Sequence, residues 1–256
     1  MIKVENVHKW FGAKHVLNGV NLEVRAGETL VIVGSSGTGK SILLKTIAGL
    51  VKPDTGSIKI DDVDIIKCSA FTLHEAQKKI GYVFQEAALF DSLDIFENVA
   101  FGLKTLTSLN KNEIEQRVVK CLTMVGLENI EHLKPSELSC GMRKRAGIAR
   151  AVAYQPRCIL YDEPTTGLDP IMSDVISDLI INLREHLQIT SIVVTHDMNS
   201  AYKIADRIMM LYKGKMIFNG TSEETRNTKN EYVRQFVEGS SRGPIINDRA
   251  FEMKRI

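Results

Sequence analysis

The stretch GSSGTGKS, residues 34–41, decides the fold of this chain. It follows ETLVIVG (28–34), an apolar run typical of a strand buried on both faces, and it opens KSILLKTIAGL (40–50), whose apolar residues recur at helical spacing. Strand, glycine-rich loop, Lys-Ser and helix in this order match the phosphate-binding loop G-x-x-x-x-G-K-[ST]. The sequence therefore predicts a site for the phosphates of a nucleotide.

The residues of this loop have separate expected roles. Gly34, Gly37 and Gly39 let the backbone turn closely, so that its amide groups point at phosphate oxygens. The positive end of the following helix strengthens the field. We expect Lys40 to neutralise charge on the β- and γ-phosphates and Ser41 to place a hydroxyl on Mg²⁺. Nucleotide contacts are expected from Gly34, Ser35, Ser36, Gly37, Thr38, Gly39, Lys40, Ser41 and Ile42.

A second apolar run, RCILYDEP (157–164), ends in two carboxylates. Asp162 is placed to hold Mg²⁺ through water, and Glu163 can polarise an attacking water as a general base. Taken alone, an apolar run that ends in Asp-Glu is common, and a solvated strand end would explain it. Because α/β folds place their ligands at one edge of the sheet, we expect both carboxylates to lie near Lys40. Together these residues indicate a nucleoside triphosphatase.

Two other classes of phosphate-loop protein do not fit. A GTPase would need a guanine-reading N-K-x-D motif, and the nearest string, NKNE (110–113), lacks the aspartate. Small-molecule kinases usually end the second strand without a paired Asp-Glu, and they need an arginine-rich lid.

Strand-like and helix-like segments alternate along the chain, which predicts an α/β fold with a mainly parallel core sheet. The further expected strands are RCILYD (157–162), TSIVVTH (190–196) and RIMMLYKGKMIF (207–218). The further expected helices are EIEQRVVKCLTMVGL (113–127), RKRAGIARAVAY (143–154) and IMSDVISDLIINLREHL (171–187).

Three regions depart from this alternation. The N-terminal segments IKVENVHKWF, HVLNGVNLEV and GSIKIDDVDI are short and alternating, which predicts an antiparallel β-subdomain. Residues 86–153 are almost wholly helical in pattern and predict a helical subdomain. One domain is expected over residues 1–238, with a C-terminal extension at 239–256 whose sequence loses periodicity and is expected to run over the surface.

The composition fits a chain with a sizeable core and gives no sign of a nucleic-acid partner. Of 256 residues, 44% are hydrophobic and 25% charged, and the net charge is only +2. No segment approaches the roughly 20 apolar residues of a membrane helix, so we expect a soluble chain that can dock on a membrane protein. The scattered cysteines predict reduced cytosolic thiols: Cys68, Cys121, Cys140 and Cys158.

Four further polar residues lie at the ends of expected elements: Gln85 in YVFQEAALF, Ser139 in LSCGM, Asp169 in TTGLDP and His196 in TSIVVTH. As single residues they would be a loop residue, two helix caps and a partly buried histidine. Their order and spacing beside the phosphate loop and the paired carboxylates indicate one shared site.

With these motifs the chain resembles the ATP-binding cassette (ABC) family from about residue 1 to residue 238. The resemblance implies a P-loop NTPase of the ABC ATPase type that uses ATP and Mg²⁺. Gln85 would be the Q-loop residue, which touches Mg²⁺ and water, and His196 the switch histidine that contacts the γ-phosphate. The implied catalytic residues are Glu163, His196, Lys40 and Gln85, and the implied metal site is Ser41, Gln85 and Asp162.

The resemblance also implies a head-to-tail homodimer with two ATP molecules at its interface. Ser139 and Gly141 would form the signature turn that meets the partner's ATP, and Asp169 would be the D-loop aspartate. Phe11, in HKWFG, would stack on adenine, with Trp10 as the alternative.

Three segments are most similar to the ATPases of MCE-type phospholipid transport systems: FQEAALFDSLDIFENVAF (84–101), PSELSCGMRKRAGIARA (135–151) and VRQFVEGSSRGPI (233–245). This implies lipid transport between the membranes of a double-membrane bacterium, powered from the cytoplasmic face of the inner membrane by a peripheral ATPase. The implied partners are transmembrane permease subunits and a periplasmic MCE lipid-binding protein, with a STAS-domain subunit as a further candidate.

Two alternatives stay open on the sequence. The first is the ATPase of an amino-acid or other small-solute importer. The second, an ABC ATPase outside transport, fits less well, because only 99 residues separate Lys40 from Ser139 and they hold no sustained heptads.

The signature segment itself raises two questions. Arg143, Lys144 and Arg145 form a basic run, and we expect most of this charge to be solvated. Cys140 stands where the family has glycine, so the sequence predicts lost access to positive φ and added bulk near the γ-phosphate.

Overall fold

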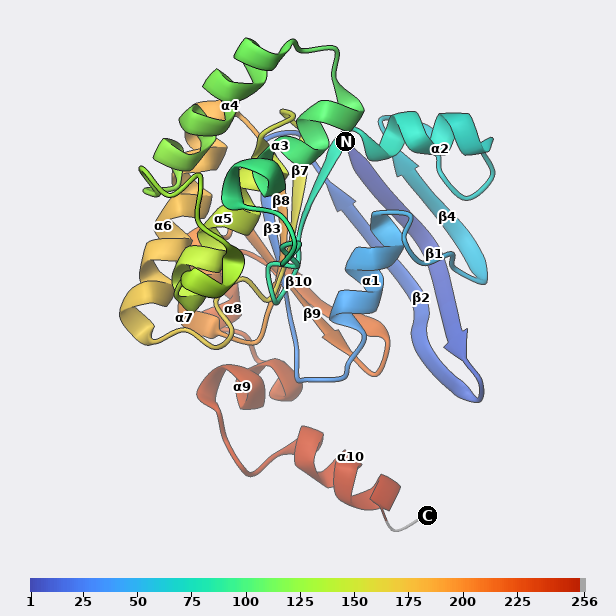
Figure 1. The fold of residues 1–256 in the computed structure, drawn as a ribbon. Coiled ribbons are helices and arrows are strands. Elements are labelled where there is room, and N and C mark those ends of the chain that lie inside the picture. Colours follow the sequence, from blue (N-terminus) through green and yellow to red (C-terminus); the bar gives the residue numbers. More distant parts are fainter. Residues whose placement is uncertain (254–256) are drawn as a thin grey trace.

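Two sheets form the frame of the molecule (Figure 1). The computed structural model describes residues 1–253, with side chains through Asp248. The larger sheet has the order β10-β9-β3-β8-β7-β6, and every neighbouring pair is parallel except β10 with β9. Its strands are β3 (Thr29–Val33), β6 (Ile80–Val83), β7 (Cys158–Asp162), β8 (Thr190–Thr195), β9 (Arg207–Tyr212) and β10 (Lys215–Gly220). The prediction of a mainly parallel core sheet is confirmed.

The smaller sheet is antiparallel, as the alternating N-terminal segments predict. Its order is β2-β1-β4-β5. The strands are β1 (Ile2–Phe11), β2 (Lys14–Val24), β4 (Thr55–Ile60) and β5 (Val63–Asp64).

The central strand β3 has a packed core on each face. Leu30 and Ile32 belong to the core that includes α1 (Lys40–Ile47) and the inner face of the smaller sheet. Val31 and Val33 belong to the core formed with the helices on the opposite face. This double burial explains the unbroken apolar run of β3, because neighbouring side chains point to opposite faces and both faces are covered.

The remaining helices cover the other face of the large sheet and the edges of the molecule (Figure 1). They are α2 (Ala70–Gln77), α3 (Ile95–Leu106), α4 (Lys111–Met124), the 3₁₀ turn η1 (Pro135–Glu137), α5 (Cys140–Val152), α6 (Pro170–Leu187), α7 (Met198–Ile204), α8 (Ser222–Arg226), α9 (Glu231–Glu238) and α10 (Pro244–Met253).

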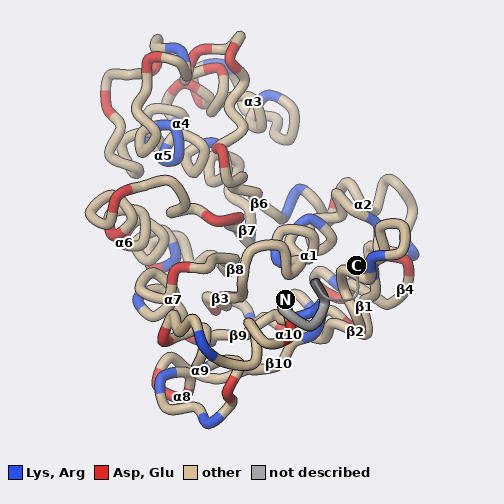
Figure 2. The backbone as a smooth tube through the Cα atoms, turned by 90° about the horizontal axis from the view of Figure 1, so that it is seen from below, with Lys and Arg blue, Asp and Glu red and all other residues tan. Residues whose placement is uncertain are grey.

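The helical subdomain is present where the sequence predicts it. Residues 86–153, all of which the structure describes, contain α3, α4, η1 and α5 and no strand. Figure 2 shows α3, α4 and α5 gathered at one end of the molecule, away from the small sheet. The subdomain places α5 beside the loop that follows β6, and this contact matters for the site below.

One expectation from the sequence is wrong. Residues 207–218 are not one strand but a hairpin, because Lys213 and Gly214 have φ of 46° and 73° and reverse the chain between β9 and β10. Positive φ at both central residues is what a two-residue hairpin turn needs. The C-terminal extension, whose sequence lacks a clear period, forms the helix α10 (Pro244–Met253); Ile245 packs into the core, whereas Ile246 and Asn247 are exposed.

The surface chemistry agrees with the composition. Basic and acidic residues are interspersed along the backbone (Figure 2). Within the described residues, no helix has both the length and the apolar character to cross a membrane. All four cysteines are free thiols, as expected.

Candidate functional site

The phosphate loop joins β3 to α1 in a conformation that requires glycine. Gly34, Gly37 and Gly39 have φ of 156°, 79° and 103°. A Cβ on Gly34 would overlap the carbonyl oxygen of Leu211 at the end of β9, and a Cβ on Gly39 would lie 2.9 Å from the carbonyl oxygen of Val16. The loop therefore rests directly on neighbouring backbone, where a side chain cannot enter.

Lys40 is the first residue of α1, and its side chain turns back into the loop. Its Nζ donates to the carbonyl oxygens of Gly34 (2.8 Å) and Ser35 (3.2 Å) and lies 3.3 Å from Oε1 of Glu163. Only 5% of the Lys40 side chain is exposed. The ammonium group is thus held at the centre of the loop, where an anionic phosphate would lie.

The paired carboxylates lie at the carboxyl end of β7, as predicted. Asp162 is buried and accepts a hydrogen bond of 2.6 Å from the Ser41 hydroxyl to its Oδ1. Glu163 has a left-handed backbone with φ of 51°. Such a conformation costs a non-glycine residue on the order of 1–3 kcal/mol and persists where surrounding structure fixes it, often at active sites.

Glu163 is held by three side chains. Lys40 lies against Oε1, whereas the Oε2 atom accepts hydrogen bonds from Thr166 Oγ1 (3.0 Å) and His196 Nδ1 (2.7 Å). Because a carboxylate only accepts, Nδ1 of His196 carries the proton in this contact. The imidazole is about half exposed, with its other nitrogen available to a ligand.

These residues line one cavity of about 650 Å³. From the predicted site it contains Phe11, Ser36, Gly37, Gly39, Lys40, Ser41, Ile42, Gln85, Glu163 and His196. Lys14, Val16 and Thr166 also line it and were not predicted. Lys14 follows the predicted aromatic residue by three positions, and Thr166 belongs to the quoted TTGLDP, so the sequence held a weak signal for both.

The aromatic residues at the end of β1 have different surroundings. Phe11 is 49% exposed and lines the cavity. Trp10 is not among its lining residues and instead stacks on His15, with ring centroids 4.1 Å apart and an interplanar angle of 11°. Of the two aromatic candidates, Phe11 has the better position to meet an adenine.

Seven predicted residues are not among those that line this cavity. Gly34, Ser35, Thr38 and Asp162 belong to the phosphate loop and to the end of β7 described above, whereas the other three lie at the starts of two other helices. Ser139 is the N-cap of α5 and accepts from the Met142 amide (3.3 Å), Gly141 follows in the same turn, and Asp169 is the N-cap of α6. The carboxylate of Asp169 accepts from the amides of Ile171 (2.9 Å) and Met172 (3.0 Å). Within one chain both turns are ordinary helix caps.

Cys140 has no special backbone conformation. It is the first residue of α5, is exposed, and does not have positive φ. Gly141 is also helical, so this turn does not depend on glycine for its φ angle. The lost access to positive φ therefore has no consequence at Cys140 in this structure, and only its side-chain bulk distinguishes it from glycine.

The basic run of α5 is not mainly solvated, which corrects the second expectation about this segment. Arg143 donates to the carbonyl of Leu138 (2.6 Å), and Arg145 donates to the carbonyl of Gly126 (2.8 Å). Lys144 is 5% exposed and donates to the carbonyl of Gln85 (3.1 Å). Burial lowers the pKa of Lys144. Each cation thus binds a backbone carbonyl near a turn.

One face of α5 holds the loop that follows Gln85. Arg150 donates to the carbonyls of Ala87 (2.7 Å) and Ala88 (2.6 Å), whose φ angles of 60° and 49° are left-handed. Gly147 lets this loop approach closely, because a Cβ there would lie 3.2 Å from Cβ of Ala87. The helix that begins at the signature turn therefore fixes the backbone of the predicted Q-loop.

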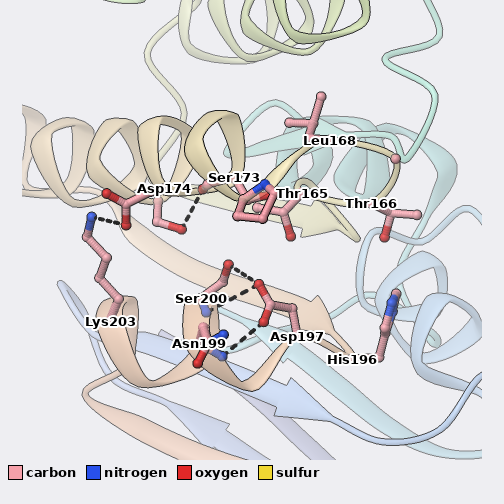
Figure 3. A pocket seen from close by; sticks show the side chains of 13 residues that line it. Thr165, Thr166, Leu168, Ser173, Asp174, His196, Asp197, Asn199, Ser200 and Lys203 are labelled. Carbon is pink, nitrogen blue, oxygen red and sulfur yellow. Dashed lines mark hydrogen bonds and ion pairs between the residues drawn. The ribbon is translucent and has the colours of Figure 1, made fainter.

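A second cavity, of about 360 Å³, lies between α6 and α7 beside His196 (Figure 3). Thr166 and His196 line both cavities. At the end of this cavity away from His196, Lys203 of α7 forms ion pairs with Asp174 (2.5 Å) and Asp178 (2.7 Å) of α6. These ion pairs connect the two helices.

The predicted metal site has the right chemistry for Mg²⁺. Ser41 and Asp162 bring a hydroxyl and a carboxylate together, and Gln85 lines the cavity into which Ser41 opens. Mg²⁺ prefers such oxygen ligands and usually takes only one or two from the protein, with phosphate and water supplying the rest. Among the described residues no cluster of three or more His, Cys, Asp or Glu side chains could hold a metal ion.

Comparisons with known proteins agree with this geometry. The ABC transporter family model matches residues 17–166. A probable ribonucleotide transport ATP-binding protein, mkl, of Mycobacterium leprae is 41% identical over 244 residues, covering 95% of this chain and 70% of that protein. The intermembrane phospholipid transport system ATP-binding protein MlaF of Haemophilus influenzae is 42% identical over 245 residues, covering 96% and 93%. The dimeric ATP-binding cassette MJ0796, in a post-hydrolysis state bound to ADP and Pi, superposes with a TM-score of 0.80 at 36% identity, over 87% of this chain and 99% of that one.

Proposed function

This chain belongs to the ABC transporter family, and we propose that its ATPase activity drives the movement of phospholipid between two membranes. The observation that carries the ATPase chemistry is the convergence of Lys40, Glu163 and His196 in one cavity at the carboxyl edge of the sheet. The assignment of phospholipid as the cargo rests on similarity along nearly the whole length of MlaF, a protein named for phospholipid transport.

ATP binding begins at the phosphate loop. The loop amides and the start of α1 attract the phosphates, and the Lys40 ammonium exchanges part of its contact with Glu163 for contact with phosphate oxygens. Phe11 offers a ring face to adenine. Because Lys40 already lies within the loop, this exchange requires only a short movement of one side chain.

Glu163 is the group best placed to accept a proton from the attacking water. Thr166 and His196 hold its Oε2 atom from two sides and so fix the direction of the carboxylate. His196 also borders the solvent side of the cavity, where its free nitrogen can reach the terminal phosphate. Gln85 lines the same cavity and is available to orient the water.

Mg²⁺ supplies charge neutralisation at the phosphates when it is bound with ATP. Ser41 and Asp162 would hold it, with Gln85 beside them. Ser41 and Asp162 already share a hydrogen bond, so their oxygens need little rearrangement to face one ion.

A second copy of the chain completes the site in this proposal. Ser139 and Gly141 lie outside the cavity of their own chain and have amides at the start of α5 that suit a phosphate. The similar cassette MJ0796 was solved as a dimer. We therefore assign Ser139, Gly141 and Asp169 to the nucleotide site of the partner copy, in a homodimer docked on permease subunits.

The proposed location is the cytoplasmic face of an inner membrane, where the dimer would be a peripheral subunit bound to its permease. A periplasmic MCE lipid-binding protein and a STAS-domain subunit are the further partners that we propose.

The test is to purify the full chain with its native membrane partners and to identify the proteins and lipids that accompany it by mass spectrometry. The proposal expects a permease, an MCE protein and enriched phospholipid. A second candidate cargo is a small solute, which the ribonucleotide name of the mkl relative favours. Recovery of a solute-binding protein without an MCE protein would replace the lipid assignment and leave the ATPase untouched.

A further inference from the structure

Tyr82, the first residue of the segment YVFQEAALF that contains Gln85, contacts the buried carboxylate of Asp162. It lies on β6, between Gly81 and Val83, and its hydroxyl donates to Oδ2 of Asp162 at 3.0 Å. A carboxylate oxygen can only accept, so the phenol hydroxyl is the donor of this hydrogen bond.

The two oxygens of Asp162 are bound by two different hydroxyls. Ser41, from α1, donates to Oδ1 at 2.6 Å, and Tyr82 donates to Oδ2. A carboxylate held at both oxygens cannot rotate about its terminal bond without breaking one of these hydrogen bonds. Asp162 thus has a fixed plane before any nucleotide arrives.

We propose that Tyr82 is a positioning residue that orients Asp162 toward Mg²⁺, an inference that rests on the proposed role of Asp162 in the function above. If Ser41 used its oxygen to bind Mg²⁺, its hydrogen bond to Oδ1 would weaken, and Tyr82 would remain as the protein donor that keeps the carboxylate in place. Partners of this kind typically account for about 10–100-fold in metal affinity.

The position of Tyr82 also connects the metal site with the Q-loop. Gln85 follows three residues later, and the ring of Tyr82 packs on that of Phe84, with centroids 4.3 Å apart. A shift of the loop that moves the end of β6 would move the donor of Asp162 as well. Through Tyr82, the position of the Asp162 carboxylate therefore depends on the position of the loop that holds Gln85.

The chain offers a closely matched control. Tyr161 precedes Asp162 on β7 and is fully buried, and its hydroxyl has no hydrogen-bond partner among the described residues. Tyr82→Phe and Tyr161→Phe each remove one phenol hydroxyl: Tyr82 contacts Asp162 in space, and Tyr161 precedes it in the sequence. Only the first removes a hydrogen bond to the carboxylate.

The experiment measures binding of a fluorescent, non-hydrolysable ATP analogue to the full chain as a function of Mg²⁺ concentration. Mg²⁺ should strengthen binding of the analogue, and we expect Tyr82→Phe to raise the Mg²⁺ concentration that gives half of this effect about 10-fold. The affinity for the analogue without Mg²⁺ should stay unchanged. Tyr161→Phe should match the wild type in both measurements. Thermal unfolding of both variants without ligand shows whether the fold is kept.

Asp162→Asn, measured in parallel, separates the two proposals. If Asp162→Asn weakens the Mg²⁺ dependence and Tyr82→Phe does not, the role of Tyr82 is refuted while Asp162 keeps its own. If neither variant changes it, the assignment of Asp162 in the proposed function is refuted and that of Tyr82 with it. A Tyr82→Phe protein that binds the analogue equally weakly with and without Mg²⁺ would show a structural role only, which also overturns the proposal.

Discussion

Lys40 and Glu163 form a buried ion pair at the centre of the nucleotide cavity, with 3.3 Å between Nζ and Oε1 and with 5% and 10% of their side chains exposed. The cation that should bind phosphate and the carboxylate that should accept a proton thus neutralise each other before ATP arrives. In our proposal a bound phosphate takes over part of the contact of Lys40, so the carboxylate of Glu163 would be freed from this partner only in the loaded site.

Glu163→Gln should separate binding from hydrolysis. We expect turnover to fall at least about 100-fold, the usual contribution of a general base. ATP affinity should be equal to or higher than that of the wild type, because Lys40 no longer has an anionic competitor. Phosphate release and titration with a fluorescent ATP analogue measure the two quantities. The exposed Glu185→Gln on α6 is the control, and hydrolysis at the wild-type rate in Glu163→Gln would exclude Glu163 as the base.

Hydrolysis by the isolated chain should rise more steeply than linearly with its concentration. The reason is that Ser139 and Gly141 lie outside their own cavity, so that in our proposal each site needs two chains. Specific activity measured across the dimerisation range, together with the mass of the particle by light scattering, checks this. Constant specific activity over a range in which the mass doubles would mean that one chain is a complete enzyme.

Arg150→Met should destabilise the protein by about 1.5–3 kcal/mol, the usual range for hydrogen bonds that involve a charged group. Its guanidinium donates to the carbonyls of Ala87 and Ala88, and the variant leaves both acceptors without this donor. Urea unfolding gives the free energy of unfolding. Lys120→Met on the exposed face of α4 should change it by no more than about 0.5 kcal/mol. An equally small effect of Arg150→Met would mean that other groups hold the loop.

Glu28 should contribute to stability at neutral pH and lose that contribution in acid. Burial opposes its ionisation, but hydrogen bonds from Arg207 (2.6 Å) and the Arg25 amide (2.8 Å) outweigh burial and lower the pKa of Glu28 below its usual 4.5. A lowered folded-state pKa means that the contribution is present above about pH 4.5 and disappears as the pH falls through the lower value.

The measurement is the difference in unfolding free energy between wild type and Glu28→Gln from about pH 7 down to about pH 3. This difference should be largest near neutrality and should shrink in acid. Glu128→Gln, at an exposed position, serves as the control for general charge effects. A difference that stays constant with pH would show that Glu28 acts through packing rather than through its charge.

The sequence predicted the parts of the site that depend on local chain order. Gly34, Gly39 and Lys40 could be placed because the loop, the strand before it and the helix after it are contiguous. Asp162 could be placed beside them because parallel strands bring their carboxyl ends to one edge. These are rules of backbone geometry and need no knowledge of which side chains meet.

Contacts between distant faces could not be predicted in this way. Lys144 belongs to a basic run that is typical of a solvated helix face, but the docking of α5 on the loop after β6 buries it. The same docking brings Arg150 to the carbonyl of Ala87. Tyr82 lies in an apolar strand, and the alternation of side chains along that strand does not indicate that its hydroxyl donates to Asp162. The hairpin at Lys213 was missed because lysine with positive φ has no strong signal in the sequence.

Trp10 can serve as an intrinsic fluorescence probe. It is the only tryptophan of the sequence, it stacks on His15, and its neighbour Phe11 opens into the nucleotide cavity. All indole emission therefore comes from one end of β1, and contact with imidazole makes that emission sensitive to the position and charge of the ring. If nucleotide binds beside Phe11 as proposed, stopped-flow fluorescence of the unlabelled protein should detect its arrival, with no dye attached to the site.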